Sequence, residues 1–168
     1  MQIRRAGPED AESIVEVVNA AWRWAYAHII PAEELATLEN PERTERIRNS
    51  LCKEQVTFVA EIDEQIVGFA SLQEPCRLPQ ADFEIGGLYV HPDAARKGIG
   101  QALLKRAVDE GLKRNRRKLA IHTLRDNHIG RAFYDRLGGQ IIHEDEWSFR
   151  GVWYPTVWYL YEDMRSLI

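Results

Sequence analysis

Sulfur is scarce in this sequence, which has two cysteines and two methionines among 168 residues. The cysteines, Cys52 and Cys76, do not form a C-x-x-C pair, so no dithiol motif is present. We expect both to be reduced thiols that pack against their neighbours. The five histidines are scattered without ligand spacing, so no metal site is predicted.

Long apolar runs are also missing. No stretch approaches the ~20 residues that a membrane-spanning helix needs, so no membrane partner is expected. The first ten residues, MQIRRAGPED, carry charges where a secretory signal peptide would have its apolar segment. We therefore predict a cytoplasmic protein.

The sequence has no excess of positive charge. Lys and Arg number 22 against 26 Asp and Glu, which gives a net charge of −4. General nucleic-acid binders are usually basic, so no nucleic-acid partner is predicted. The one basic run, KRNRRK at 113–118, lies where a helix is expected to end, and it fits the negative end of the helix dipole there. A patch that binds polyanions is the alternative.

The length and composition fit a single globular domain over residues 1–168. Hydrophobic residues make up 45% and charged residues 29%, an ordinary balance for a folded protein. A chain of this length buries roughly 70% of its unfolded surface, enough for a core without metal or disulfide.

Hydrophobic periodicity and turn signals divide the chain into strands and helices. The predicted strands cover 2–5, 56–62, 65–72, 83–90, 118–124, 140–147 and 152–161. The predicted helices cover 8–30, 41–53, 98–113 and 128–137. Strands mixed with helices in this way imply an α/β layered domain with a mixed sheet.

The segment 83–113 reads as strand, loop, glycine turn and helix. Gly98 and Gly100 would let backbone N–H groups approach a ligand, at a helix N-terminus where the dipole favours an anion. Arg96 and Lys97 add two cations to the same turn. The pattern predicts a cradle for phosphate or pyrophosphate, and a helix start that merely needs flexible glycine is the alternative.

Two common phosphate loops do not fit this turn. A P-loop requires G-x-x-x-x-G-K-[ST], and no Lys-Ser/Thr step is present. The dinucleotide fingerprint G-x-G-x-x-G requires a third glycine where the chain has Leu103, and its glycines directly follow a strand. A nucleotide-binding protein that uses this turn is therefore a weaker alternative.

The residues around the turn carry a family resemblance. HPDAARKGIGQALL at 91–104 resembles the acetyl-CoA loop of the GNAT superfamily of N-acetyltransferases, Gln/Arg-x-x-Gly-x-Gly/Ala. The first position of that pattern is Ala95 here, and Arg96 beside it is the cation expected to replace it. NHIGRAFYDRLGG at 127–139 resembles the family's Asn…Ala-x-x-Phe-Tyr element, and the hairpin FVAEID…QIVGFASL is similar too.

The resemblance implies a fold and a cosubstrate. The fold would be a mixed, mostly antiparallel central sheet of about six or seven strands flanked by about four helices. The cosubstrate would be acetyl-CoA, whose acetyl group passes directly to an amine. The resemblance places its pyrophosphate on Arg96, Lys97, Gly98, Ile99, Gly100 and Gln101, and its pantetheine arm along the backbone of Leu88 and Val90 and beside Asn127.

Three catalytic tasks follow from that chemistry. Gly86-Gly87 inside a strand predicts a bulge that would free a backbone N–H to polarise the thioester, although the glycines could instead relieve helix packing. Glu84 is the candidate base, because a carboxylate between Phe83 and Ile85 tends toward a raised pKa. His122 is the competing base, with a packed strand histidine as the alternative.

Tyr134 is the candidate general acid, because it matches the family's tyrosine near the cofactor sulfur. We expect Phe133 to face the core and Tyr134 the cofactor, since adjacent helical positions cannot share one face. Asn127 is predicted to cap the same helix.

The acceptor amine is not identified by the sequence. Aromatic side chains near the end of the first helix and in the last strands are candidates for its pocket, although most aromatics build the core: Trp22, Trp24, Tyr26, Trp147, Trp153 and Trp158. A non-catalytic acyl-CoA sensor is the alternative function. A homodimer is compatible with the sequence, which does not fix the oligomeric state.

Overall fold

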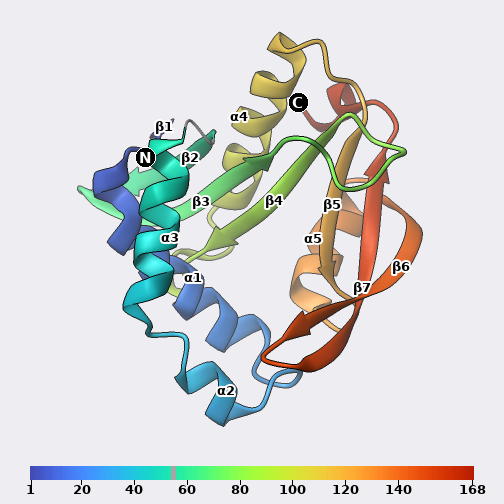
Figure 1. The fold of residues 1–168 in the computed structure, drawn as a ribbon. Coiled ribbons are helices and arrows are strands. Elements are labelled where there is room, and N and C mark those ends of the chain that lie inside the picture. The colour runs from blue at the N-terminus through green and yellow to red at the C-terminus, as the bar shows by residue number, and fades with distance from the viewer. Residues whose placement is uncertain (54–55) are drawn as a thin grey trace.

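The computed structural model describes residues 1–53 and 56–168. Over these residues, seven strands form one sheet in the order β1-β2-β3-β4-β5-β7-β6 (Figure 1). Neighbouring strands are antiparallel except β4 and β5, which are parallel. The strands are β1 (Gln2–Arg5), β2 (Thr57–Ile62), β3 (Gln65–Gln73), β4 (Phe83–Val90), β5 (Leu119–Leu124), β6 (Gln140–Phe149) and β7 (Val152–Tyr161). The predicted mixed, mostly antiparallel sheet is confirmed.

Helices cover both faces of this sheet. The described residues form α1 (Ala11–Ala25), α2 (Ala32–Ala36), α3 (Pro41–Cys52), α4 (Ile99–Lys113) and α5 (His128–Arg136). One apolar core joins α4 and α5 to the sheet, and a second joins α1 and α3 to the opposite face (Figure 1). The amphipathic spacing of these helices therefore produced two cores that share one sheet.

The first helix is shorter than the sequence predicts, because it ends at Ala25 rather than near Ile30. The N–H of Tyr26 donates to Trp22 O at 2.9 Å, and the N–H groups of Ile29 and Ile30 then both donate to Tyr26 O at 2.9 Å. This turn buries the side chains of Tyr26 and Ile30, which are 6% and 1% exposed. Tertiary packing thus ends the helix early, and it is followed by α2, which the periodicity did not predict.

The two halves of the sheet separate along β4 and β5. The two strands pair only from Phe83–Leu119 to Ile85–Ile121 among the described residues. Opposite this point, β3 pairs Leu72 with Ile85 and Ser71 with Gly87, which leaves Gly86 as an extra residue. The bulge predicted at the two glycines is therefore confirmed, and it lies where β4 turns away from β5.

The basic run at 113–118 follows the end of α4, as predicted. Arg114 pairs with Glu74 at 2.5 Å and with Glu110 at 3.0 Å, and Arg116 pairs with Glu74 at 3.1 Å. Acidic side chains of the same chain compensate these charges. The structure therefore favours a basic run that complements the end of the helix over a surface that binds polyanions.

The two cysteines are free thiols in different surroundings. Cys52 is exposed at the end of α3, so the prediction that it packs is wrong. Cys76 is half-buried, and its thiol donates to Leu78 O at 3.4 Å. Within residues 1–53 and 56–168, no helix combines the length and apolar character needed to cross a membrane.

Candidate active site

The turn before α4 presents unpaired backbone donors. Gly98 caps the helix with φ +79°, a left-handed conformation that glycine adopts without strain. The N–H of Ala102 makes the first helical bond, to Gly98 O at 3.0 Å, so the N–H groups of the first helical turn remain directed outward. Such a helix end is suited to an anion.

The two cations of this turn differ. Arg96 is exposed at φ +62°, and no ion pair of its guanidinium occurs within the described residues. Lys97 reaches back, and its Nζ donates to Asp93 O at 3.1 Å. Arg96 is therefore the cation that is available to a ligand at the turn.

The open edge of β4 lies next to the helix turn. The N–H of His91 donates to Val67 O of β3 at 2.8 Å, and alternation along an antiparallel strand then directs the N–H and C=O groups of Leu88 and Val90 away from β3. A Cβ on Gly100 would lie 3.8 Å from side-chain carbons of Val90 and Phe133. The backbone that sequence reasoning assigned to pantetheine thus faces the space between β4 and β5.

Three tyrosines of this region influence one another's titration. Burial raises the pKa of Tyr134 on α5, and Tyr89 of β4 is the next cause. Burial also raises the pKa of Tyr26, which follows α1, and Tyr89 again adds to the effect. Tyr134 and Tyr26 belong to the cores on opposite faces of the sheet, and Tyr89 influences both hydroxyl groups.

The packing of α5 differs from the prediction. Tyr134 is the enclosed residue, 7% exposed, with its ring centre 5.4 Å from that of Tyr159, whereas Phe133 is half-buried. The expected orientation, Phe133 inside, is wrong because α5 packs its Tyr134 side on β7. Within the described residues, no hydrogen bond engages the Tyr134 hydroxyl, and its raised pKa keeps the proton on oxygen.

Asn127 is the helix cap that the sequence predicts. Its Oδ1 accepts from the N–H of Gly130 at 3.0 Å, and its Nδ2 donates to Thr123 Oγ1 at 3.0 Å. The side chain is buried and ties α5 to the end of β5. Both ends of the amide are therefore engaged inside the protein.

Glu84 is fully buried on β4, and apolar neighbours are only part of its surroundings. The side chain of Arg77 lies against it: Nε donates to Oε1 at 3.0 Å, and Nη2 pairs with the same oxygen. The N–H of Arg77 donates to Oε2 at 3.0 Å. The expectation of a carboxylate among apolar side chains is corrected, because a guanidinium from the loop between β3 and β4 covers it.

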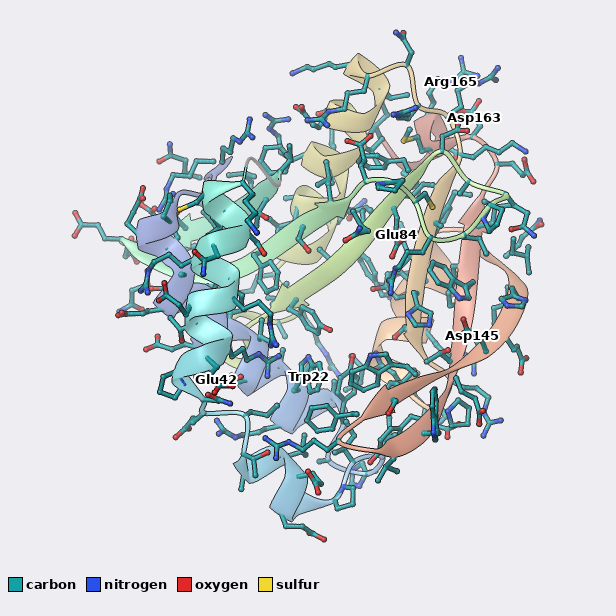
Figure 2. The ribbon with its side chains drawn as sticks, in the orientation of Figure 1. Trp22, Glu42, Glu84, Asp145, Asp163 and Arg165 are labelled. Atoms are coloured by element: carbon teal, nitrogen blue, oxygen red, sulfur yellow. The ribbon has the colours of Figure 1, made fainter. Side chains whose placement is uncertain are left out.

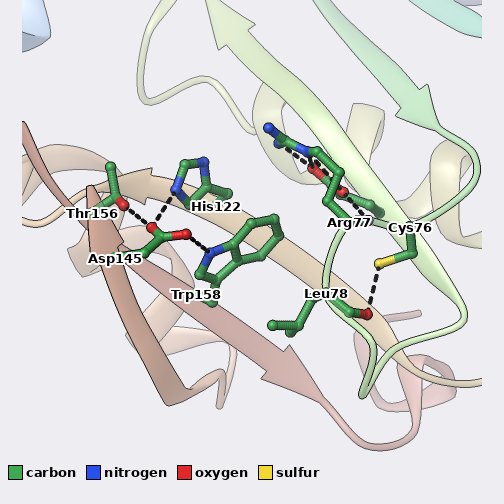
Figure 3. A network of polar contacts seen from close by, with 8 residues as sticks. Cys76, Arg77, Leu78, His122, Asp145, Thr156 and Trp158 are labelled. Atoms are coloured by element: carbon green, nitrogen blue, oxygen red, sulfur yellow. Dashed lines mark hydrogen bonds and ion pairs between the residues drawn. The ribbon is translucent and has the colours of Figure 1, made fainter. Parts of the chain in front are cut away.

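His122 belongs to a polar network on the same face (Figure 3). Its Nε2 lies 3.3 Å from Asp145 Oδ1, and its ring stacks on Trp158 with centres 4.4 Å apart. Trp158 Nε1 donates to Asp145 Oδ2 at 3.0 Å, and Thr156 donates to the same carboxylate. Burial lowers the pKa of His122, which leaves the imidazole neutral at pH 7.

A cavity of about 240 Å³ lies between α1, α3 and the sheet. The bulge residues Gly86 and Gly87 line it together with Ser71 and Tyr89. The helices contribute apolar side chains, two arginines and one serine: Ile14, Val18, Trp22, Arg43, Arg46, Ile47, Ser50 and Leu51. The bulge therefore borders both this cavity and the space between β4 and β5.

Of the candidate acceptor aromatics, Trp22 lines the cavity. It packs edge-on against Trp147 and Phe149 of β6, with ring centres 5.7 and 5.5 Å away. Figure 2 labels Trp22 on α1. Trp24 and Trp153 are exposed. The hairpin of β6 and β7 thus closes one end of the region that contains Trp22.

The sequence reading missed Arg43 and Arg46. Together with Ile47 and Ser50 they lie at the spacing of one helix face. That spacing is the only feature of the sequence that could have indicated them. Nothing in the local pattern distinguishes this stripe from a solvent-exposed face. These residues line the cavity only because α3 packs over this part of the sheet.

Comparison with known proteins places these features in context. The model of the acetyltransferase (GNAT) family matches residues 14–139. A spermidine N(1)-acetyltransferase from Thermoplasma acidophilum is 26% identical over 155 residues, which cover 89% of this chain and 94% of that protein.

Solved structures share the fold. A GCN5-related N-acetyltransferase from Rhodopseudomonas palustris superposes with a TM-score of 0.79 at 22% identity, covering 96% of this chain and 94% of that one. The PaiA N-acetyltransferase from Thermoplasma acidophilum, solved in complex with coenzyme A, gives a TM-score of 0.72 at 23% identity, covering 92% and 96%.

Proposed function

The chain belongs to the GNAT acetyltransferase family, and we propose that it transfers the acetyl group of acetyl-CoA to the primary amine of a small molecule or peptide. One observation supports this most directly. The bulge at Gly86 and Gly87 borders the cavity on one face of the sheet and lies where β4 leaves β5. A cofactor entering along β4 and an amine in the cavity would meet at that bulge.

The cofactor would lie along the donors already described. We assign its pyrophosphate to the turn of Arg96, Lys97 and Gly98 and to the first helical residues, Ile99 to Gln101. The open backbone of Leu88 and Val90 would pair with the pantetheine amides. Asn127 would act mainly by fixing the start of α5, since its amide is engaged by Thr123 and Gly130.

Acetyl transfer forms one bond, breaks one bond and moves two protons. The nitrogen lone pair of the neutral amine forms a bond to the thioester carbonyl carbon, and the carbon–sulfur bond then breaks. The electron pair of that bond leaves on sulfur, and the amine loses one proton to a base. The sulfur takes one proton from Tyr134, whose hydroxyl is protonated at neutral pH. The products are an N-acetyl amide and the free thiol of coenzyme A.

Two side chains compete for the role of base. Glu84 lies two residues before the bulge, but both of its oxygens accept from Arg77, and proton transfer would require Arg77 to release one. His122 is neutral, and its contact with Asp145 through Nε2 leaves Nδ1 as an acceptor. A lysine-like amine costs roughly 4–5 kcal/mol to deprotonate at pH 7, so one of these groups is needed.

Two measurements test the proposed function. Titration calorimetry with acetyl-CoA, ATP and NAD should give heat only with acetyl-CoA. A thiol-release assay with a panel of amines, spermidine included, should then give turnover with at least one. Binding of acetyl-CoA without turnover by any amine would instead favour a sensor, and binding of ATP or NAD alone would refute the assignment of the turn.

A further inference from the structure

The cavity between α1, α3 and the sheet contains positive charge without compensation. Half-buried Arg43 and exposed Arg46 both line it, and within the described residues neither guanidinium has an ion pair or a hydrogen bond. The guanidinium carbon of Arg43 lies 4.9 Å from the centre of the Trp22 ring, so an aromatic face is its neighbour instead of a carboxylate. Burial lowers the pKa of Arg43, Tyr89 acts against this, and Arg46 lowers the pKa further.

Several other arginines of the chain are paired. Arg48, two positions beyond Arg46 on the same helix, binds Glu45 at 2.6 Å and Glu12 at 3.3 Å. Arg4, Arg77 and Arg114 are also matched with acids. A half-buried cation costs solvation free energy unless an anion compensates it. The missing anion at Arg43 therefore points to a ligand.

The remaining polar groups of the cavity agree with this. The indole N–H of Trp22, a residue only 9% exposed, has no hydrogen-bond partner among the described residues. Hydroxyl groups come from Ser50, Thr57 and Ser71. No Asp or Glu occurs among the described residues that line the cavity. The set is rich in donors and carries positive charge only.

The rest of the wall is apolar, and the volume is small. Ile14, Val18, Ile47, Leu51 and Phe69 supply aliphatic and aromatic surface. At about 240 Å³, the cavity falls below the ~300–1,000 Å³ of pockets for drug-sized ligands. A compact ligand with an apolar part and one anionic group fits these walls.

We propose that the acceptor is a free amino acid with an apolar side chain, whose carboxylate binds Arg43 and Arg46 and whose amine reaches the bulge at Gly86. This inference rests on the proposed acetyl transfer. Carboxylate and guanidinium match in a two-bonded geometry that Lys cannot reproduce. A polyamine would bring like charges to the two arginines, so spermidine should be a poor acceptor here.

The test compares acceptors with and without a carboxylate. Leucine and phenylalanine are assayed against leucinamide and phenylalaninamide, which keep the amine and side chain but lack the carboxylate, and against spermidine. We expect KM for the acids to be roughly 10- to 100-fold lower than for the amides, because charged hydrogen bonds are lost with the carboxylate. Arg43→Gln should remove most of that preference, and Arg43→Lys should restore only part of it.

Arg48→Gln is the matched control, because Arg48 lies on the same helix and is paired outside the cavity. It should leave the preference unchanged. Amides or spermidine that react as well as the acids would overturn the inference while leaving acetyl transfer intact. Titration of leucine and phenylalanine into protein saturated with coenzyme A measures acceptor binding without turnover. Absence of binding there would overturn the inference, whereas absence of acetyl-CoA binding would refute the proposed function itself.

Discussion

The guanidinium of Arg43 lies over the ring of Trp22, with 4.9 Å between the guanidinium carbon and the ring centre. The contact joins α3 to α1 at the wall of the cavity that borders the β4 bulge. Cation–π attraction holds the cation without neutralising it. The contact therefore places the guanidinium at the cavity wall with its charge intact.

Gly98→Glu should abolish acetyl-CoA binding, because it places a side chain and a negative charge at the helix end proposed for the pyrophosphate. Gly98→Ala is the matched control. Both variants carry the strain of a left-handed conformation, about 1–2 kcal/mol, but only one carries the charge. Calorimetry should therefore show a modest loss of affinity for Ala and no binding for Glu. Equal affinities of the two variants would contradict the placement of the anion.

Tyr134→Phe should lower turnover by roughly two orders of magnitude and leave acetyl-CoA affinity nearly unchanged. General acid catalysis contributes ~10²–10⁴-fold, and a thiolate is a fair leaving group, so the lower end is expected. Tyr159→Phe is the control, because that hydroxyl donates to Asp135 at 2.7 Å and should affect only the melting temperature. Full activity of the Tyr134 variant with reduced thermal stability would assign this tyrosine to the core.

Glu84→Gln and His122→Asn should separate the two candidate bases. Removing the base should reduce turnover most between mildly acidic and neutral pH, where the amine is protonated. If Glu84 only holds Arg77, the turnover of its variant should fall by the same factor at every pH. The pKa of His122 is lowered by burial, so its protonation should slow the wild-type enzyme only below about pH 6.5. The His122 variant should lack that decline if the imidazole is the base.

Asp10→Asn should destabilise the fold at neutral pH. Arg4 donates two hydrogen bonds to this buried carboxylate, at 2.7 and 2.8 Å, and they hold the pKa of Asp10 below its ordinary value. A lowered carboxyl pKa adds stability above the unfolded value, about 3.8, and this stability is lost as the pH falls through the folded value. Denaturant melts should show a loss of about 1–3 kcal/mol at pH 7 that shrinks below pH 4.

The exposed pair of Asp163 and Arg165 provides the control for that experiment. Its side chains are 38% and 60% exposed, and surface pairs add little to stability. Asp163→Asn should therefore leave the melting curve nearly unchanged at both pH values. A loss as large as that of the Asp10 variant would show that charge alone, rather than the buried connection between β1 and α1, carries the effect.

Much of the fold follows from local sequence. Alternation and β-branched residues located all seven strands within a few positions, and Asn40-Pro41 and Asn127 marked helix starts that the structure confirms. Gly86-Gly87 predicted the bulge for a physical reason that acts within the strand itself. Such features depend on residues close in sequence, so a single sequence is enough to predict them.

The tertiary structure decided what each candidate side chain meets. Arg77 covers Glu84 from a loop, His122 meets Asp145 across two strands, and Arg43 reaches Trp22 from another helix. The sequence by itself determined the glycine turn, the order of elements and the family. It could not determine these pairings, because a contact between residues far apart in the chain depends on how the elements pack. The same packing buried Tyr134 and placed Arg43 and Arg46 of α3 at the cavity wall.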